Sequence, residues 1–406
     1  MTSSQIAPIL RIISKLLSKV LLDRLIPGIP VFREISFEIG SRAIQTETLF
    51  AASRSVIAKE IPIENSPSKT VGESQTYEEI RAHMLENATV FYNRRFSPLL
   101  VGRHCIVTER KEPGPWDFGI GRTNKQPGSV LVQNAKAIGF RGGFARRRLD
   151  QALYIGTRAP DNYYHWLINA LPALHLANES TIVPGDAPIL VPEILRTRSQ
   201  LVEALEVVAN TRPMEYFRMS ESIHVKRLFV IDPPPVYDTP LSRNQKDRRP
   251  LTLHSLAMNS FRDNILQAVV PKPGKVAKER LFLLRPKGDN RAVNQEELLR
   301  VAEDFGFLGV RTEVMSFMEQ VELFSTAKFI TGPTGAAFTN ILFSSKAKSL
   351  LYKASLDDNE NFFALLASIG GGQVFSLDYG PDESDNPGNL SPVRFRKALQ
   401  SLLPSE

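Results

Sequence analysis

The chain has 406 residues, of which 42% are hydrophobic and 23% charged, a balance that is typical of a globular protein and excludes a disordered or fibrous one. The 50 lysines and arginines outnumber the 43 aspartates and glutamates, and the net charge of +7 favours anionic partners such as phosphates, nucleic acid or an acidic membrane surface. Cys105 is the only cysteine, which excludes an intramolecular disulfide or a cysteine-based metal cluster and favours a reducing compartment.

The N-terminal segment, residues 1–40, is predicted to contain an amphipathic helix. Apolar residues gather on one helical face, and Arg11 and Lys15 lie on the other. No run of about 18 apolar residues occurs in the chain, which argues against a membrane-spanning helix. The interrupting charges fit a signal peptide poorly. Residues 1–26 could therefore lie on an anionic membrane surface or pack on the domain body.

The length predicts two domains of about 150 to 200 residues. The first is assigned to residues 41–235. Within it, residues 78–87 resemble a short amphipathic helix, and residues 86–157 contain short β-like runs separated by loops. Farther on, residues 187–191 and 225–231 are expected to be strands, with a helix over 193–208 between them.

A Pro- and charge-rich linker over residues 236–253 is predicted to join the second domain, residues 254–380, and a C-terminal tail follows over 381–406. Strands and helices alternate through the second domain, which implies a parallel sheet with right-handed crossovers and a ligand site at the carboxyl ends of its strands. The predicted strands are 280–285, 309–314, 328–331, 349–353 and 373–377, and the main helices are 254–270, 294–306 and 317–327.

The sharpest local motif follows the strand at 328–331. Gly332, Pro333 and Gly335 come directly after this strand, and a helical pattern begins near Ala336. Small residues at such a position allow an anionic ligand to reach the free N–H groups of the first helical turn. The alternative is a tight strand-to-helix turn with no ligand.

Cations follow the strand at 280–285. Arg285, Lys287 and Arg291 lie at a carboxyl end, where they could neutralise a diphosphate, although each could also be a solvated surface charge. Ser316 and Glu319 have the spacing of a capping box, with a ribose contact as the alternative role of Glu319. The chain has no Asp-x-Asp triplet and its histidines lack paired metal-ligand spacing, so a metal site is poorly supported.

Residues 161–174, DNYYHWLINALPAL, form an apolar helical pattern that contains a histidine. Asn162, His165 and Asn169 cluster within about 60° on a face away from the apolar stripe. A lone histidine on a buried helix is usually a core residue with satisfied hydrogen bonds. Two amides beside it favour a polar cleft wall, and both interpretations stay open on the residues alone.

Several of these motifs together resemble glycosyltransferase family 61. The family joins an Asn-Tyr-Phe/Tyr-His-Trp segment, here Asn162 to Trp166, to a late Gly-x-His-Gly-Ala-Gly-x-Thr-Asn-x-Leu-Phe segment, here Gly332 to Phe343. Between them, residues 280–298 look like the family's Arg-bearing strand and Asn-Glu segment, and residues 318–327 like its Glu-Gln helix. The resemblance covers residues 128–377.

The resemblance implies an α/β fold of the GT-B type, in which two Rossmann-like domains face each other across a cleft. It also implies an inverting transfer from a nucleotide-sugar donor, with no obligatory metal or other cofactor. Carried over by position, the donor-binding residues would be Arg285, Lys287, Arg291, Glu319, Gly332, Thr334, Gly335, Ala336 and Asn340. Because an inverting transfer needs a base near the acceptor hydroxyl, His165 is the candidate base, with Asn162 and Asn169 beside it.

Two positions depart from the family pattern. Thr334 stands where the family usually has histidine, and Gln295 replaces an acidic residue. A threonine hydroxyl can still donate a hydrogen bond to a phosphate. If the histidine were essential, however, the chain would be a non-catalytic nucleotide-sugar or polysaccharide-binding relative.

We therefore expect a bacterial glycosyltransferase that acts on a glycan or lipid-linked glycan acceptor in capsule or other surface polysaccharide synthesis. The expected location is cytoplasmic, with residues 1–26 holding the enzyme at the inner face of the cytoplasmic membrane. A nucleic-acid partner is not expected, because the second half lacks the interleaved aromatics and cations of a stacking surface.

Overall fold

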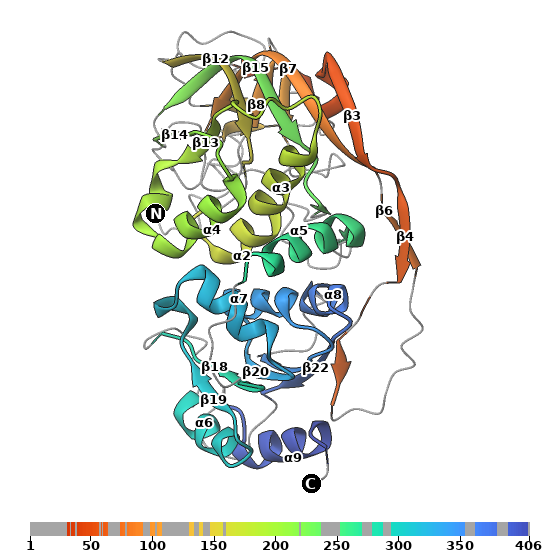
Figure 1. Cartoon of the computed structure of the whole chain (residues 1–406), viewed down its shortest axis with the longest axis vertical. Coiled ribbons are helices and arrows are strands. Elements are labelled where there is room, and N and C mark those ends of the chain that lie inside the picture. Colours follow the sequence, from red (N-terminus) through yellow and green to blue (C-terminus); the bar gives the residue numbers. More distant parts are fainter. Residues whose placement is uncertain are drawn as a thin grey trace, which may run out of the picture. The chain divides into compact units, whose positions relative to one another are not determined.

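The computed structural model forms two compact units (Figure 1). One comprises Met1–Ala51, Glu79–Arg198 and Ala209–Thr252, and the other Ala52–Glu78, Ser199–Val208 and Leu253–Glu406. The residues that the structure describes are 31–32, 34–36, 39–56, 58, 60–63, 74–77, 79–91, 98–101, 104–107, 130–133, 138–140, 147–156, 160–218, 221–236, 252–269, 278–286, 294–353, 362–379 and 389–404. Residues 1–30 of the predicted amphipathic segment and 237–251 of the predicted linker lie outside them.

The first unit is built on a nine-stranded mixed sheet. Its parallel half has the order β14-β13-β12-β15, so β13 and β14 lie on one side of β12 and β15 lies on the other. In open α/β sheets, ligands bind at the carboxyl ends of the strands beside such a reversal of order. These four strands are β12 (Arg147–Tyr154), β13 (Ile189–Pro192), β14 (Met214–Phe217) and β15 (Ser222–Ile231).

The antiparallel half of this sheet continues from β15 through β7, β8 and β9, and β2 is parallel to β9. β3 pairs with the first half of β7. The strands are β2 (Glu34–Ser36), β3 (Gln45–Phe50), β7 (Ile80–Phe91), β8 (Pro98–Val101) and β9 (His104–Val107).

The prediction of a helix over residues 78–87 is wrong, because β7 is a 12-residue strand that begins at Ile80. It pairs with β15 along most of its length and with β3 beside its first half. Hydrogen bonds to strands on both sides outweigh the local helical pattern, since secondary-structure propensity is a weak prior against tertiary pairing.

Helical segments connect the parallel strands of the first sheet. Between β12 and β13 the chain forms α2 (Tyr163–His165), a π-helical segment η2 (Trp166–Ala170) and α3 (Leu171–Glu179). Between β13 and β14 it forms the 3₁₀ helix η3 (Glu193–Thr197) and α4 (Ser199–Ala209). The predicted alternation of strands and helices is confirmed here, and one face of the sheet buries a cluster that includes Leu85, Tyr154, Leu190, Phe217 and Leu228.

The second unit contains a six-stranded parallel sheet of order β19-β18-β20-β21-β22-β5. In chain order the first five of these strands are arranged 2-1-3-4-5, so the order reverses between β18 and β20. The strands are β18 (Arg280–Leu283), β19 (Leu308–Val310), β20 (Phe329–Pro333), β21 (Lys348–Lys353), β22 (Gln373–Asp378) and β5 (Ile61–Pro62).

The helices of the second unit follow the predicted alternation with two differences. The expected strand over 309–314 ends at Val310, and the helix after β20 is a 3₁₀ helix. The helices are α5 (Ser255–Gln267), α6 (Gln295–Glu303), η5 (Thr312–Val314), α7 (Phe317–Ser325), η6 (Ala336–Phe343), α8 (Phe362–Ile369) and α9 (Pro392–Leu402).

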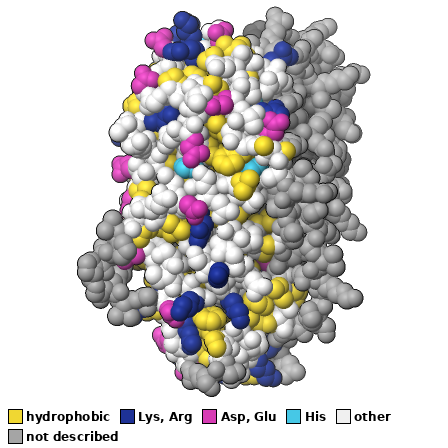
Figure 2. Space-filling model, turned by 45° about the vertical axis from the view of Figure 1, so that its right-hand side comes forward, with side chains coloured by type: hydrophobic (Ala, Val, Ile, Leu, Met, Phe, Trp, Pro, Cys, Tyr) yellow, Lys and Arg dark blue, Asp and Glu magenta, His cyan; other side chains and the backbone are white. Residues whose placement is uncertain are grey.

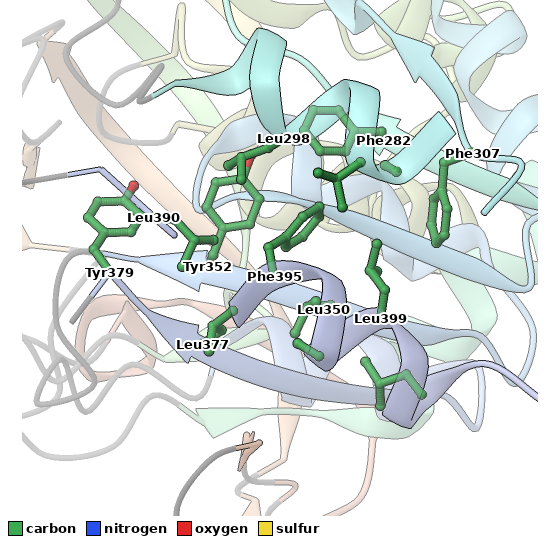
Figure 3. Close-up of a cluster of buried hydrophobic side chains, with 14 residues drawn as sticks. Phe282, Leu298, Phe307, Leu350, Tyr352, Leu377, Tyr379, Leu390, Phe395 and Leu399 are labelled. Atoms are coloured by element: carbon green, nitrogen blue, oxygen red, sulfur yellow. The ribbon is translucent and has the colours of Figure 1, made fainter. Parts of the chain in front are cut away.

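Helix α9 lies within the predicted C-terminal tail and packs into the core of the second unit (Figure 3). Phe395 is fully buried against the rings of Phe282 and Tyr352, with ring centroids 6.1 Å and 5.8 Å apart. Burial of a phenylalanine side chain contributes about 1.5 to 3 kcal/mol to folding. The apolar face of α9 therefore belongs to the hydrophobic core.

Three small pairings complete the described strands. β1 (Val31–Phe32), β11 (Ile138–Phe140) and β10 (Val130–Gln133) form a three-stranded sheet, which confirms β structure in the region predicted to be sheet-rich. β4 (Ser53–Val56) pairs with β6 (Ser74–Tyr77). β16 (Pro235–Val236) pairs with β17 (Thr252–Leu253) at the two ends of the predicted linker.

Charged side chains of both signs occur from one end to the other of the described surface in Figure 2. Within the described part of the chain, no helix is both long and apolar enough to span a membrane.

Candidate functional site

The candidate donor site of the second unit lies where its strand order reverses, at the carboxyl ends of β18 and β20. Arg285 follows β18 by two residues, and Gly332 and Pro333 end β20. The Arg285 side chain reaches the loop after β20, where its Nη2 donates a hydrogen bond to the Thr334 carbonyl oxygen at 2.5 Å. Two segments predicted to share an edge are therefore in contact.

Gly335 is needed because the Arg285 guanidinium occupies the space of a side chain. A β-carbon at Gly335 would lie 1.9 Å from Nη2 and 2.7 Å from Cζ of Arg285. Glycine is required at position 332 for a different reason. A β-carbon at Gly332 would lie 2.8 Å from Cβ of Leu283 and 3.0 Å from the Leu283 carbonyl oxygen. One glycine thus admits the guanidinium, and the other allows β20 to pack closely against β18.

The turn after β20 places backbone N–H groups beside this guanidinium. The helix η6 starts at Ala336, as predicted, and its first internal bond runs from the Phe338 N–H to the Gly335 carbonyl oxygen at 3.0 Å. The N–H groups of Ala336 and Ala337 precede that bond and are not used by the helix itself. A guanidinium next to the start of a helix is suited to an anion such as a diphosphate.

Tyr352 lies fully buried on β21 next to this loop. Its carbonyl oxygen accepts a hydrogen bond from the Thr334 N–H at 3.1 Å, which fixes the turn. Burial, reinforced by Tyr379, raises the pKa of the Tyr352 phenol well above its ordinary value, and Arg285 opposes the rise. Among the described residues, the Tyr352 hydroxyl has no hydrogen-bond partner.

Glu319 and Asn340 have structural contacts. The capping box is confirmed, because the Ser316 Oγ accepts from the Glu319 N–H at 3.2 Å and the Glu319 Oε2 accepts from the Ser316 N–H at 2.9 Å. Asn340 is fully buried and its Nδ2 donates to Gln320 Oε1 at 2.9 Å. The capping box occupies one oxygen of Glu319, and the Gln320 contact holds Asn340 inside the unit.

A second carboxylate holds the start of α7. Glu203 of α4 accepts hydrogen bonds from the N–H groups of Phe317 and Met318 at 2.6 Å and 3.3 Å. A carboxylate at this end of a helix also complements the helix dipole. The two remaining predicted cations, Lys287 and Arg291, lie outside the described residues.

In the first unit, the histidine-bearing segment begins just beyond the carboxyl end of β12. Asn162 is the N-cap of α2, with φ −98° and ψ 121°, and its Oδ1 accepts from the Tyr164 N–H at 3.0 Å. Asn162 therefore lies outside the helix. The predicted helical face that Asn162 would share with His165 and Asn169 does not form.

The helix changes to π geometry at Trp166 because of the proline that follows. Pro172 has no N–H, and its ring excludes the carbonyl oxygen of the residue four positions earlier, so a regular α-helix is broken there. The wider turn is closed by the Leu171 N–H, which donates to the Trp166 carbonyl oxygen. Single π turns inside helices are frequent at functional sites.

His165 and Asn169 flank this π turn and are both nearly buried. His165 is 9% exposed and Asn169 8%, and the ring of Tyr164 meets the imidazole edge to face at 4.9 Å. Within the described part of the chain, the buried Asn169 Oδ1 has no hydrogen-bond partner. A buried polar atom without a partner is costly, which favours a polar site here over an ordinary core.

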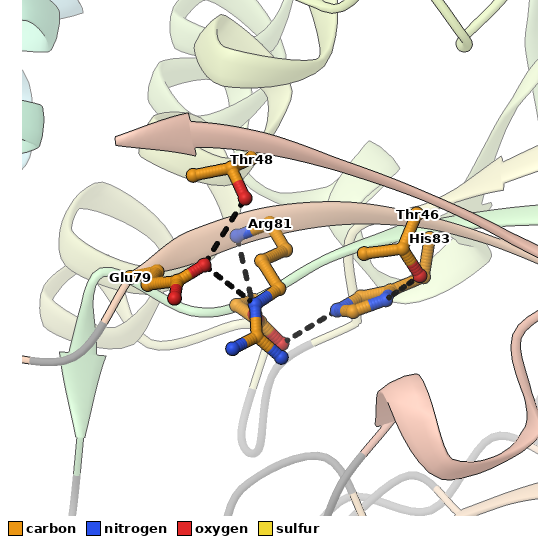
Figure 4. Close-up of polar contacts among 6 residues, drawn as sticks. Thr46, Thr48, Glu79, Arg81 and His83 are labelled. Atoms are coloured by element: carbon orange, nitrogen blue, oxygen red, sulfur yellow. Dashed lines mark hydrogen bonds and ion pairs between the residues drawn. The ribbon is translucent and has the colours of Figure 1, made fainter. Parts of the chain in front are cut away.

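A polar network that the sequence did not predict lies at the same edge of the first sheet (Figure 4). His83 Nε2 lies 3.1 Å from Asp232 Oδ1, and His83 Nδ1 lies 3.1 Å from Thr46 Oγ1. The other Asp232 oxygen accepts from the Arg81 N–H at 3.2 Å. The network ties β3, β7 and the end of β15 together, and no spacing in the sequence relates residues 149 positions apart.

Comparison with known proteins identifies one family model. The model described as Glycosyltransferase 61 matches residues 163–351. None of the curated proteins matches the chain. The matched range includes His165 and Asn169 in the first unit and Arg285 and the glycine turn in the second.

Proposed function

Because residues 163–351 match the family model Glycosyltransferase 61, we propose that this chain is an inverting enzyme of that family. In this proposal it transfers a hexose or pentose from a nucleotide-sugar donor to a hydroxyl of a glycan or lipid-linked glycan. The proposed process is the synthesis of a bacterial capsule or another surface polysaccharide.

The contact between Arg285 and the glycine turn is the observation that carries this proposal. The guanidinium rests on Gly335 at the reversal of strand order, beside the first N–H groups of η6. As the bond from the sugar to the diphosphate breaks, negative charge grows on the departing nucleotide. Preorganised donors at that position stabilise the transition state more than the ground state. We assign this role to Arg285 and the Ala336 and Ala337 N–H groups, without an obligatory metal.

His165 is the proposed base on the acceptor side. Its imidazole would remove the proton of the acceptor hydroxyl while that oxygen attacks the anomeric carbon from the face opposite the diphosphate, which inverts the configuration. The buried Oδ1 of Asn169 would accept a hydrogen bond from a second acceptor hydroxyl. A GT-B arrangement of the two units is part of the proposal, since the reaction requires both substrates to meet.

A donor screen tests the proposal. The full chain is heated with UDP-, GDP-, dTDP- and CDP-sugars, and we expect one class to raise the melting temperature. Donor hydrolysis is then compared between wild type, His165→Ala and the matched control His224→Ala, whose imidazole lies 3.3 Å from Thr89 Oγ1 elsewhere in the sheet. His165→Ala should lower turnover about 100- to 10,000-fold and leave donor stabilisation intact. Equal turnover in all three proteins would exclude His165 as the base.

Thr334 favours a second candidate function. It stands at the position of the family histidine, beside the proposed phosphate site, and it has no titratable group. A non-catalytic nucleotide-sugar or polysaccharide-binding protein would be stabilised by a donor but would show no hydrolysis or transfer. The same screen therefore separates the two functions.

Peripheral membrane attachment through residues 1–26 completes the proposal. The basic and apolar faces predicted there favour the anionic inner face of the cytoplasmic membrane, where lipid-linked acceptors are made. We expect the full chain to float with vesicles that contain phosphatidylglycerol and expect deletion of residues 1–26 to abolish flotation. Equal flotation of both proteins would contradict the attachment.

A further inference from the structure

Gln295 makes an unusual pair of contacts with the backbone of Arg285. Its side chain is buried at the first position of α6. Gln295 Oε1 accepts from the Arg285 N–H at 2.9 Å, and Gln295 Nε2 donates to the Arg285 carbonyl oxygen at 3.1 Å. One amide group thus satisfies both backbone groups of one residue.

These two bonds take the place of the inter-strand hydrogen bonds at the point where β18 ends. The last ladder bond runs from the Leu284 N–H to the Val310 carbonyl oxygen at 2.8 Å. Beyond it, the backbone of Arg285 has left the sheet, and its carbonyl oxygen receives a further hydrogen bond from Arg311 Nη1 at 3.3 Å. The Gln295 amide therefore fixes the backbone from which the guanidinium extends to Thr334.

We propose that Gln295 is a positioning residue that holds Arg285 over Gly335 for binding of the nucleoside diphosphate. The inference rests on the proposed function, because it requires a donor phosphate at Arg285. In this chain, an ionised glutamate would not make both of these bonds. It would lack the N–H that meets the Arg285 carbonyl oxygen, and its charge would attract the guanidinium away from the ligand.

A double-mutant cycle tests this role with nucleoside diphosphates as probes. The dissociation constants of UDP, GDP, dTDP and CDP are measured for wild type, Gln295→Glu, Arg285→Ala and the double variant. We expect Gln295→Glu to weaken the best-bound nucleotide about tenfold in the wild-type background and to have no further effect when Arg285 is absent. Gln295→Met, which keeps the length but makes neither bond, should weaken binding in the same way.

The outcomes separate the two proposals. An equal loss of affinity with and without Arg285, or no loss in either background, would overturn the positioning role while leaving the proposed function in place. A wild-type chain that binds none of the four nucleotides would overturn both. Melting temperatures of all five proteins show whether a variant remains folded at the temperature of the binding measurement.

Discussion

Replacing Arg285 by lysine is expected to lower kcat/KM for the donor about 100- to 1,000-fold, the range found when one preorganised donor to a developing anion is removed. The arginine uses Nη2 to bond the Thr334 carbonyl oxygen, and its planar fork carries several N–H donors in a fixed geometry. A lysine ammonium is a single flexible charge and cannot maintain both contacts. Initial rates of transfer or hydrolysis with the donor found by thermal shift measure the effect.

Gly335→Ala disturbs the same guanidinium without changing its charge. The added methyl group would overlap Arg285 Nη2, so the side chain must move, and a displacement of about 1 Å is enough to lower turnover roughly 100-fold. Gly185→Ala is the matched control, because a β-carbon at that glycine meets no atom within 4 Å. Wild-type kcat/KM in Arg285→Lys would contradict the assigned role, whatever the glycine variants do.

The approach of Arg285 to the glycine turn could be predicted because it depends only on parallel strands. Two segments that each follow a strand of one parallel sheet must emerge at the same edge. The capping box of Ser316 and Glu319 could be predicted for a similar reason, since its partners are three residues apart and the geometry is local.

The parts that the sequence did not reveal depend on contacts between distant segments. β7 carries a helical pattern, yet its strand conformation is set by pairing with β15 across more than a hundred residues. The two hydrogen bonds of the Gln295 amide join a side chain to the backbone of Arg285, and a contact of this kind leaves no periodic pattern in the sequence. β5 has only two residues, too few for any pattern to identify its place at the edge of the second sheet.

In the histidine segment, the sequence does contain a residue that predicts the π turn. Pro172 is incompatible with a regular helix that begins at Tyr163, so the π turn could have been expected from the proline rule alone. The helical face drawn through Asn162 assumed an uninterrupted helix with that residue inside it. The N-cap preference of asparagine predicts its position outside the helix instead.

Removing Glu60 is expected to destabilise the docking of β5 by about 3 to 5 kcal/mol, the cost of breaking a buried ion pair by removing one partner. Glu60 Oε2 and Lys353 Nζ are 2.7 Å apart, and their side chains are only 6% and 7% exposed. The pair joins the segment before β5 to the end of β21, 293 residues later. With Glu60→Ala, the Lys353 ammonium regains water most easily if β5 leaves the sheet edge.

Hydrogen exchange followed by mass spectrometry measures this effect in the full chain, since both tryptophans belong to the first unit and fluorescence would not report on β5. Peptides that contain β5 and its partner Phe375 in β22 should exchange about 100-fold faster or more in Glu60→Ala, with peptides of β12 unchanged. The double variant Glu60→Ala/Lys353→Met should recover most of the protection, because neither charge of the pair remains.

The control is Glu279→Gln, which removes an exposed ion pair. Glu279 and its partner Lys328 have side chains that are 49% and 63% exposed, so this change should alter stability by less than about 1 kcal/mol. If the double variant exchanges as fast as Glu60→Ala, the buried ammonium of Lys353 is not the cause of the lost protection. The loss of protection would then come from other contacts of Glu60.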